Sequence, residues 1–200
     1  MKKILLLIFF LPLLACAQQN KGQIVLSGGM GKSLLGLIKL VDFSGETQTT
    51  VTPVYVGSLE VGFNKHFSIG LSGGYQKVSM HINDWEWTDQ GNVHHVDAIN
   101  WSIARLNVGP RFLVHYGVEH FDFYSGLHVA YNNNTISTDA IDPDFTVDFS
   151  GGSFGFQVTV FGARGYIGKN VGLFTEFAIG APSFINGGIT IAIQTIKETE

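Results

Sequence analysis

The sequence predicts an all-β fold, an eight-stranded antiparallel up-and-down transmembrane β-barrel, and three observations favour it. Charged residues make up only 14% of the 200 residues, whereas an average soluble domain has about 25%. The chain holds 25 glycines and 16 phenylalanines, which suits strands and tight turns better than long helices. Apolar and polar residues alternate with a period of two along much of the chain, as in strands with one apolar and one polar face.

The first 17 residues have the features of a secretory signal peptide. Two lysines precede an apolar run over residues 4–14, and the small-residue site Ala15-Cys16-Ala17 follows. We therefore expect residues 1–17 to be a signal peptide and residues 18–200 to be the β-barrel domain. An alternative stays open: residues 13–16 form a lipobox, and a lipid on Cys16 tethers the protein to a membrane.

Residues 18–200 contain no apolar run of 18 or more residues, so no helix of this part is expected to span a membrane. An exported, apolar chain without such a helix enters a membrane by closing a β-barrel, because only a closed sheet pairs every backbone group. The formal net charge of −4 and the lack of a basic stripe argue against nucleic-acid binding.

The first expected strands are a glycine-broken strand near residues 24–30 and a hairpin over residues 55–76. Residues 64–66 form the turn of this hairpin. The polar faces of its two strands carry Glu60 and Gln76. The apolar faces carry Tyr55, Leu59, Val61 and Phe63 before the turn and Phe67, Ile69, Leu71 and Tyr75 after it.

A second hairpin is expected over residues 99–131, with its turn at residues 117–119. Its first strand alternates between an apolar face with Leu106, Val108 and Phe112 and a polar face with Arg105, Arg111 and His115. A third pair occupies residues 153–166 and 171–179, and residues 185–194 form a last strand. These strands bring the total to eight.

The connections between the strands alternate between short and long. Short turns at residues 64–66, 117–119 and 168–170 alternate with longer segments at residues 41–52, 82–98, 132–151 and 181–184. Bacterial outer-membrane barrels have short periplasmic turns and long extracellular loops. Aromatic residues follow the same division: Phe63, Phe67, Tyr116, Phe121 and Tyr166 lie near the short turns, and Tyr55, Tyr75, Tyr131 and Phe154 lie near the long segments.

Two stretches of the chain support a family resemblance. Val108-Gly109-Pro110-Arg111-Phe112, and residues 161–166 with 169–176, resemble the small outer-membrane β-barrel proteins common in Bacteroidetes-type bacteria, related in architecture to the transmembrane domain of OmpA. The resemblance implies a location in the bacterial outer membrane, with outer-membrane lipid and the insertion machinery as partners. The chain departs from that family at its end, because residues 196–200 follow where a closing strand usually ends on an aromatic residue.

The inward faces of the expected strands carry charged side chains. In an eight-stranded barrel, side chains just fill the interior, and a buried charge without a partner is strongly penalised. We therefore expect a salt-bridged core that plugs the barrel; the alternative is a narrow conductance. The charged set is Glu60, Arg105, Arg111, His115 and Glu176.

Two of the longer segments are acidic and contain no lysine or arginine. We expect solvated acidic loops, with divalent cations bridging them to lipopolysaccharide phosphates as the alternative. We predict no metal site at His94 and His95, because adjacent residues of an extended chain point to opposite sides, and no cofactor. The acidic residues are Asp84, Glu86, Asp89, Asp97, Asp139, Asp142, Asp144 and Asp148.

A catalytic function is not expected. His66-Phe67-Ser68 resembles the His-x-Ser pair of lipid A deacylases, but it falls at a periplasmic turn, and no acidic residue is clearly placed to orient His66. The sequence favours a monomeric outer-membrane barrel with a structural or surface-interaction role. Two alternatives stay open: a transporter or binder of a small apolar ligand, and a lipocalin-like lipoprotein whose apolar faces point inward.

Overall fold

The computed structural model describes residues 20–34, 47–89, 92–117, 121–140, 148–167 and 170–194. The predicted signal peptide lies outside the described residues. The described part contains no helix of the length and hydropathy that a membrane span requires. Its strands are β1 (Gln23–Lys32), β2 (Thr47–Val51), β3 (Val54–Gly62), β4 (Phe67–Asp89), β5 (Asn92–His115), β6 (Phe121–Ala140), β7 (Asp148–Ile167), β8 (Val171–Gly180) and β9 (Ile185–Gln194).

Eight of these strands form a closed ring, which confirms the predicted fold class. The order around the ring is β4-β3-β1-β9-β8-β7-β6-β5, and β5 pairs with β4 to close it. All of the pairs are antiparallel. The short strand β2 pairs with β4 alone, beyond the end of β3, at Val78 to Ile82.

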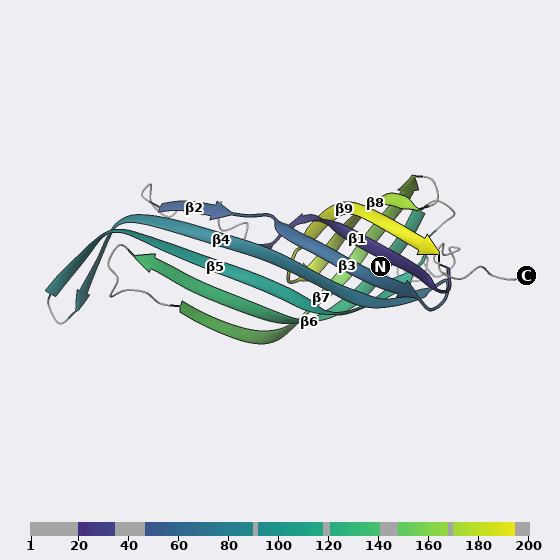
Figure 1. Cartoon of the computed structure of the whole chain (residues 1–200), viewed down its shortest axis with the longest axis horizontal. Coiled ribbons are helices and arrows are strands. Elements are labelled where there is room, and N and C mark those ends of the chain that lie inside the picture. Colours follow the sequence, from purple (N-terminus) through teal and green to yellow (C-terminus); the bar gives the residue numbers. More distant parts are fainter. Residues whose placement is uncertain are drawn as a thin grey trace, which may run out of the picture.

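Four strands are about twice as long as the others. β4, β5, β6 and β7 have 23, 24, 20 and 20 residues, whereas β1, β8 and β9 have 10. The long strands continue past the ring and form, with β2, a sheet that extends from one end of the barrel (Figure 1). We call this part, residues 47–51, 77–89, 92–104, 133–140 and 148–153, the protruding sheet.

The protruding sheet corrects the predicted boundaries. Residues 82–98 and 132–151 were expected to be loops, but most of them lie in strands, and Asn83 still pairs with Ala98. The alternation of outward apolar and inward polar residues that is typical of membrane strands ends near these positions. Hydrogen bonding between the strands continues beyond them. A strand needs backbone partners more than it needs one apolar face, so the end of the pattern did not mark the end of the strand.

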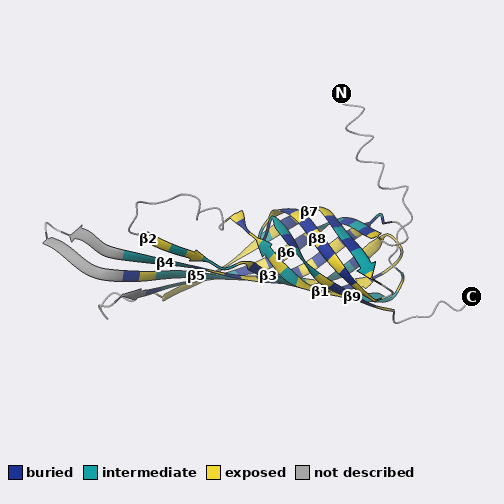
Figure 2. Ribbon diagram, turned by 90° about the horizontal axis from the view of Figure 1, so that it is seen from above, coloured by how far each residue is buried: buried dark blue, intermediate teal, exposed yellow. Residues whose placement is uncertain are grey.

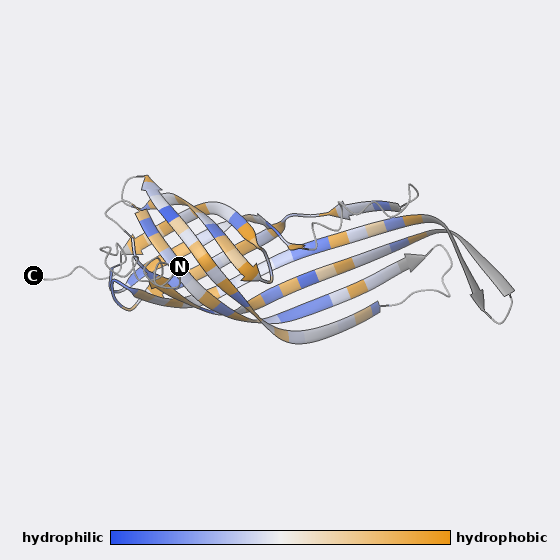
Figure 3. Cartoon of the chain, turned by 180° about the vertical axis from the view of Figure 1, so that it is seen from behind, coloured by the Kyte–Doolittle hydropathy of each residue, from blue (hydrophilic) through white to orange (hydrophobic). Residues whose placement is uncertain are grey.

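The barrel has an apolar outside and a polar inside. Buried and exposed residues alternate along the strands of the ring (Figure 2). Bands of apolar residues cover the ring (Figure 3). Leu71 is 59% exposed and Leu173 is 58% exposed, whereas the inward Glu60 and Thr190 are fully buried. A lipocalin-like barrel requires the opposite orientation.

A β-bulge in β7 changes which residues face inward. Between Thr159 and Phe161 the register with β8 shifts by one residue, and Val160 and Phe161 are both exposed, at 52% and 40%. The extra residue reverses the alternation beyond it, so that Arg164 is buried and Tyr166 follows it on the inner face. Tyr166, which the sequence groups with the aromatic residues near the short turns, therefore does not face outward with Phe67 and Phe121.

Candidate functional site

An ion pair joins opposite walls of the barrel. Both oxygens of Glu60 on β3 accept hydrogen bonds from Nη2 of Arg164 on β7, each at 2.7 Å. In the order of the ring, β3 and β7 are four strands apart, which is half of the circumference. The contact therefore crosses the whole width of the lumen.

A second ion pair lies beside the first. Arg111 on β5 donates to Oε1 of Glu176 on β8, and its Nε lies 3.6 Å from Glu60. Glu176 also accepts hydrogen bonds from the Tyr124 hydroxyl at 2.7 Å and from Asn186 Nδ2 at 3.2 Å. Each carboxylate thus has several donors, which is the condition for a charge to be stable away from water.

The ring of Tyr124 lies close to both guanidiniums. The Arg164 Cζ atom is 4.3 Å from the ring centroid, and the Arg111 Cζ atom is 5.6 Å from it. This ring requires a glycine on the neighbouring strand, because a Cβ on Gly162 would lie 2.2 Å from Tyr124 Cε2. The aromatic ring and the two cations fill the centre of the lumen together.

A third set of polar groups lies at the end of the barrel that carries the short turns. Ser68 Oγ lies 2.8 Å from Nε2 of His115, and Nδ1 of His115 donates to the Asp122 carboxylate at 2.9 and 3.0 Å. Arg164 Nη1 lies 3.5 Å from Asp122, which connects this set to the central ion pairs. Ser68, His115 and Asp122 are all buried. The resemblance to the His-x-Ser pair of lipid A deacylases joins Ser68 to His66, but the imidazole partner of Ser68 in the structure is His115.

The structure brings together four of the five charged residues that the sequence placed inside the barrel. Glu60, Arg111, His115 and Glu176 are all buried and belong to the connected network. Arg105 lies nearer the protruding sheet, is half-buried and donates to Asn134 Oδ1 at 2.9 Å.

Three ionisable members of the network were not among the predicted site residues: Asp122, Tyr124 and Arg164. Asp122 and Tyr124 face inward in the alternation of β6 opposite exposed Phe121, so the period of two contained the signal for them. Arg164 had no such signal, because strict alternation from Phe156 and Val158 places it on the outer face. The bulge in β7 reverses that assignment.

The predicted acidic residues that the structure describes are distributed over β4, β5, β6 and β7. Asp84, Asp89 and Asp97 lie on β4 and β5, and Asp139 lies on β6, all within strands. Glu86 pairs with His95 across β4 and β5. Asp148 begins β7 and is exposed. The remaining two, Asp142 and Asp144, lie outside the described residues.

The two faces of β5 exchange polarity where the strand leaves the barrel. On the inner face, the polar Arg105 is followed toward the protruding sheet by the apolar residues Ile103, Trp101 and Ile99. On the outer face, the exposed Leu106 is followed toward the protruding sheet by Ala104 and then by the polar residues Ser102 and Asn100. The alternation itself continues without a break.

The neighbouring strand β4 changes at the same level. On its inner face the polar Gln76 is followed by the apolar Val78, and on its outer face Tyr75 is followed by the charged Lys77. Val78 pairs directly with Ile103 of β5. The exchange is therefore a property of the sheet rather than of one strand.

The exchange extends across the protruding sheet and gives it two different faces. Strand pairing places one set of residues on the face continuous with the barrel interior and another on the face continuous with the apolar belt. We call the first set the inner apolar face, although it also carries Thr49 and Thr138. Its apolar members are Val51, Val78, Met80, Ile82, Ile99, Trp101, Ile103, Ile136 and Phe149. The second set is the outer polar face: Gln48, Thr50, Lys77, Ser79, His81, Asn100, Ser102, Asn133, Thr135, Ser137 and Ser150.

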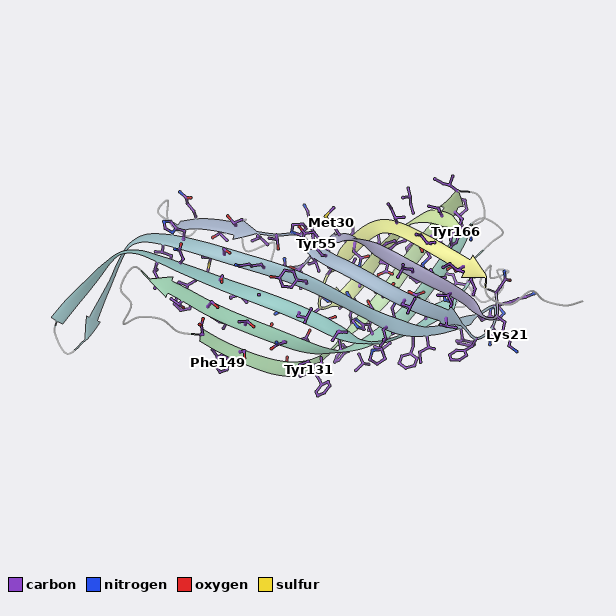
Figure 4. The ribbon with its side chains drawn as sticks, in the orientation of Figure 1. Lys21, Met30, Tyr55, Tyr131, Phe149 and Tyr166 are labelled. Atoms are coloured by element: carbon purple, nitrogen blue, oxygen red, sulfur yellow. The ribbon has the colours of Figure 1, made fainter. Side chains whose placement is uncertain are left out.

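Figure 4 relates the barrel to the protruding sheet through individual side chains. Met30 and Tyr55 lie where the ring passes into the sheet, Phe149 lies farther out, and Lys21 and Tyr166 lie toward the opposite end (Figure 4). Met30 and Tyr55 are paired across β1 and β3 and are 57% and 50% exposed. Two large side chains are thus exposed on the outside of the barrel near the level where the polarity changes.

The fold and the interior define a class of protein: a closed, antiparallel up-and-down β-barrel with an apolar outer belt and an interior of connected charges. No protein-family model matches the sequence, and no curated protein matches it either.

Solved structures with similar folds are barrels as well. The N-terminal β-barrel domain of Pseudomonas aeruginosa OprF is 12% identical, with a TM-score of 0.48 over 88% of this chain and 100% of that one. Ail, the attachment invasion locus protein of Yersinia pestis, is 11% identical, with a TM-score of 0.41 over 86% and 96%. The outer membrane protease OmpT from Escherichia coli is 11% identical, with a TM-score of 0.40 over 73% and 62%. Likenesses of this size carry no conclusion about activity.

Proposed function

We propose that this protein is a bacterial outer-membrane β-barrel with a side-chain-plugged interior and a structural or surface-interaction role. The observation that carries the proposal is the exchange of polarity at one level of the sheet. Outward residues are apolar up to Tyr75 on β4 and Ala104 on β5, and polar from Lys77 and Ser102 onward. A membrane boundary at this level accounts for the change, because lipid favours apolar outward residues and water favours polar ones.

The dimensions of the apolar belt support the same proposal. Exposed aromatic residues bound it at Phe67 and at Tyr75, eight residues farther along β4. Eight steps of about 3.4 Å, tilted by about 40°, span roughly 20 Å along the barrel axis, close to the roughly 25 Å apolar band of outer-membrane barrels. In this orientation the short turns lie in the periplasm, and the protruding sheet lies outside the cell.

Contacts across the lumen support a plugged interior. The pair of Glu60 and Arg164 joins opposite strands, and the ring of Tyr124 lies close to both guanidiniums. An ion passing through the barrel would have to break contacts between charged groups that are buried away from water. Structural support of the envelope, or contact with outside partners through the protruding sheet, therefore fits better than conduction.

The proposed partners follow from the proposed location. The apolar belt contacts outer-membrane lipid, the outer-membrane insertion machinery inserts the chain, and the inserted barrel is a monomer. Acidic residues on the extracellular side, such as the exposed Asp148, would meet lipopolysaccharide phosphates through divalent cations.

Heat modifiability tests the proposal. We expect the protein to be found in the outer-membrane fraction and to migrate differently on a detergent gel before and after boiling, because a closed barrel resists detergent until it is heated. A soluble periplasmic protein whose migration does not change on boiling would contradict the proposal.

A second candidate function is a serine hydrolase. Ser68, His115 and Asp122 are connected in the order hydroxyl, imidazole, carboxylate, with the serine at Nε2 and the aspartate at Nδ1, as in catalytic triads. However, Ser68 is only 3% exposed and His115 is 1% exposed, and Asp122 is shared with Arg164. We favour a structural role for this set.

Labelling with a fluorophosphonate distinguishes the two roles of Ser68. We expect no labelling of the folded protein, because a buried hydroxyl within the polar network cannot reach the reagent. The matched variants are Ser68→Ala and Ser72→Ala, which remove inward hydroxyls from the same strand. Labelling that disappears with Ser68→Ala and persists with Ser72→Ala would establish a hydrolase instead.

A further inference from the structure

The connection between β8 and β9, residues 181–184, turns into the barrel. Pro182 and Ser183 are buried, and Ser183 is only 1% exposed. Gly180, which directly precedes the connection, has a φ of +112°, in the left-handed region that favours glycine. This glycine lets the chain change direction at the end of β8, so that the connection points inward.

Pro182 reaches across the lumen to β4. A Cβ built on Gly74, an inward position of β4, would lie 2.8 Å from Pro182 Cγ and 3.1 Å from Pro182 Cβ. In the order of the ring, β4 is four strands from β8 and three from β9. A side chain at position 74 would therefore occupy the place of the proline ring, and glycine leaves this place free.

Neutral groups hold the connection in this position. Gln157 Nε2 on β7 donates to the backbone oxygen of Ser183 at 2.6 Å, and Asn186 Nδ2 on β9 donates to Ser183 Oγ at 3.1 Å. The backbone N–H of Phe184 donates to the backbone oxygen of Lys32, at the end of β1, at 2.9 Å. None of these donors and acceptors is charged, so the contacts do not require the ion pairs deeper in the lumen.

A second set of neutral contacts lies on β4 beside the connection. Gln76 is the next inward residue of β4 after Gly74. Its Oε1 accepts a hydrogen bond from Ser33 Oγ at 2.7 Å, and its Nε2 donates to the backbone oxygen of Thr52 at 3.1 Å. Ser33 and Gln76 are each 4% exposed. Buried polar groups thus occupy the wall next to the connection as well.

A small cavity separates the connection from the ion pairs. Pro182 and Ser183 line it together with Arg111 and Glu176, and its volume is about 10 Å³. One water molecule needs at least about this volume, so a larger solute does not fit. The lumen is therefore filled in two layers: a neutral layer at the end that carries the protruding sheet, and the layer of ion pairs beyond it.

We propose that residues 181–184 are a second plug, which closes the end of the lumen nearest the protruding sheet independently of the ion pairs. The proposal rests on the proposed function, because a plug has an effect only in a barrel that spans a membrane. In the proposed orientation this end faces the outside of the cell, and the plug keeps external solutes away from the buried charges.

A disulfide across the lumen tests the position of the connection. Cys16, the only natural cysteine, is first replaced by alanine. Gly74→Cys is then combined with Pro182→Cys, and copper phenanthroline supplies the oxidant. We expect an intramolecular disulfide, because the Cβ atoms of a disulfide lie about 3.5–4.5 Å apart and a Cβ at position 74 would start 3.1 Å from that of residue 182. The matched control is Tyr75→Cys with Pro182→Cys, for which we expect none, because Tyr75 faces outward.

Labelling of a thiol beneath the connection tests whether the connection closes the lumen. Ser27 lines the small cavity and is 5% exposed. During the time in which a water-soluble maleimide fully labels Thr50→Cys, an exposed position of the outer polar face, we expect no labelling of Ser27→Cys. Pro182→Gly with Ser183→Gly removes the ring and the hydroxyl that hold the connection, and we expect labelling of Ser27→Cys to appear.

The matched control places the same two glycines in the turn at the opposite end of the barrel. With Lys65→Gly and His66→Gly, we expect Ser27→Cys to stay protected. All of these measurements use purified protein folded in detergent, so their results do not depend on where the protein lies in the cell. Heat-modifiable migration of the same samples verifies folding and tests the proposed membrane barrel separately.

Three outcomes would overturn the proposal. A folded variant with Gly74→Cys and Pro182→Cys that forms no disulfide would mean that the connection does not reach β4. Labelling of Ser27→Cys at the rate of Thr50→Cys, with the native connection, would mean that this end of the lumen is open. Protection of Ser27→Cys that survives the two glycines at positions 182 and 183 would assign the closure to other residues.

Discussion

Replacement of Arg164 by methionine is expected to destabilise the folded barrel by about 3–5 kcal/mol, the cost of removing one partner from a buried ion pair. Arg164 donates twice to Glu60 and lies near Asp122. Without it, Glu60 loses its closest donor and Asp122 keeps only His115, while both carboxylates remain buried. The change is larger than that expected for a typical point mutation, which is about 1 kcal/mol.

The matched control removes the charge at both ends of the contact. In the double variant Glu60→Gln with Arg164→Met, the remaining groups keep their partners: Arg111 with Glu176, and His115 with Asp122. We therefore expect the double variant to recover most of the lost stability. Urea unfolding in lipid vesicles measures the free energies, and their double-mutant cycle gives the coupling between the two side chains.

Two results would contradict this account of the interior. Arg164→Met with unchanged stability would mean that the ion pair across the lumen contributes nothing to the fold. New conductance in planar bilayers of a stable, folded Arg164→Met variant would mean that the network closes a pore rather than holding the walls together.

Leu71→Arg is expected to destabilise the membrane-inserted barrel by about 2–4 kcal/mol, because an outward arginine near the bilayer midplane carries this cost. Leu71 is 59% exposed on the outer face and lies halfway between the aromatic residues Phe67 and Tyr75 on β4. The same unfolding measurement in vesicles detects the effect.

Ser79→Arg is the control for this prediction. Ser79 lies on the same strand and the same outer face, beyond the exchange of polarity, where we propose that water replaces lipid. We expect little change in stability at this position. Equal effects at Leu71 and Ser79 would contradict a membrane boundary between them and would remove the main support for the proposed location.

Local alternation predicted much of the barrel interior. Along β3 and β5, the period of two assigned Glu60, Arg111 and His115 to the polar face, and the structure places them inside. Successive residues of a strand point to opposite sides whatever surrounds them. This assignment needs only the backbone geometry of one strand, so the sequence contains it.

Other features of the interior required the neighbouring strands. Arg164 points inward because of the bulge at Val160 and Phe161, and alternation gives no sign of the extra residue. Ser68 meets His115 rather than His66 because β4 and β5 are paired in a particular register. A residue's face is local, but its partner across the lumen depends on how several strands are staggered.

The sequence by itself determined the ring of antiparallel strands and which of its faces is apolar, because both follow from alternation and the spacing of turns. Only the tertiary structure decided how far the strands extend. Residues such as Trp101 and Ile103 continue the period of two with the polarity of the faces exchanged. Whether such residues remain paired depends on the hydrogen bonds of their neighbours, which lie far away in the sequence, and those bonds extend the barrel into the protruding sheet.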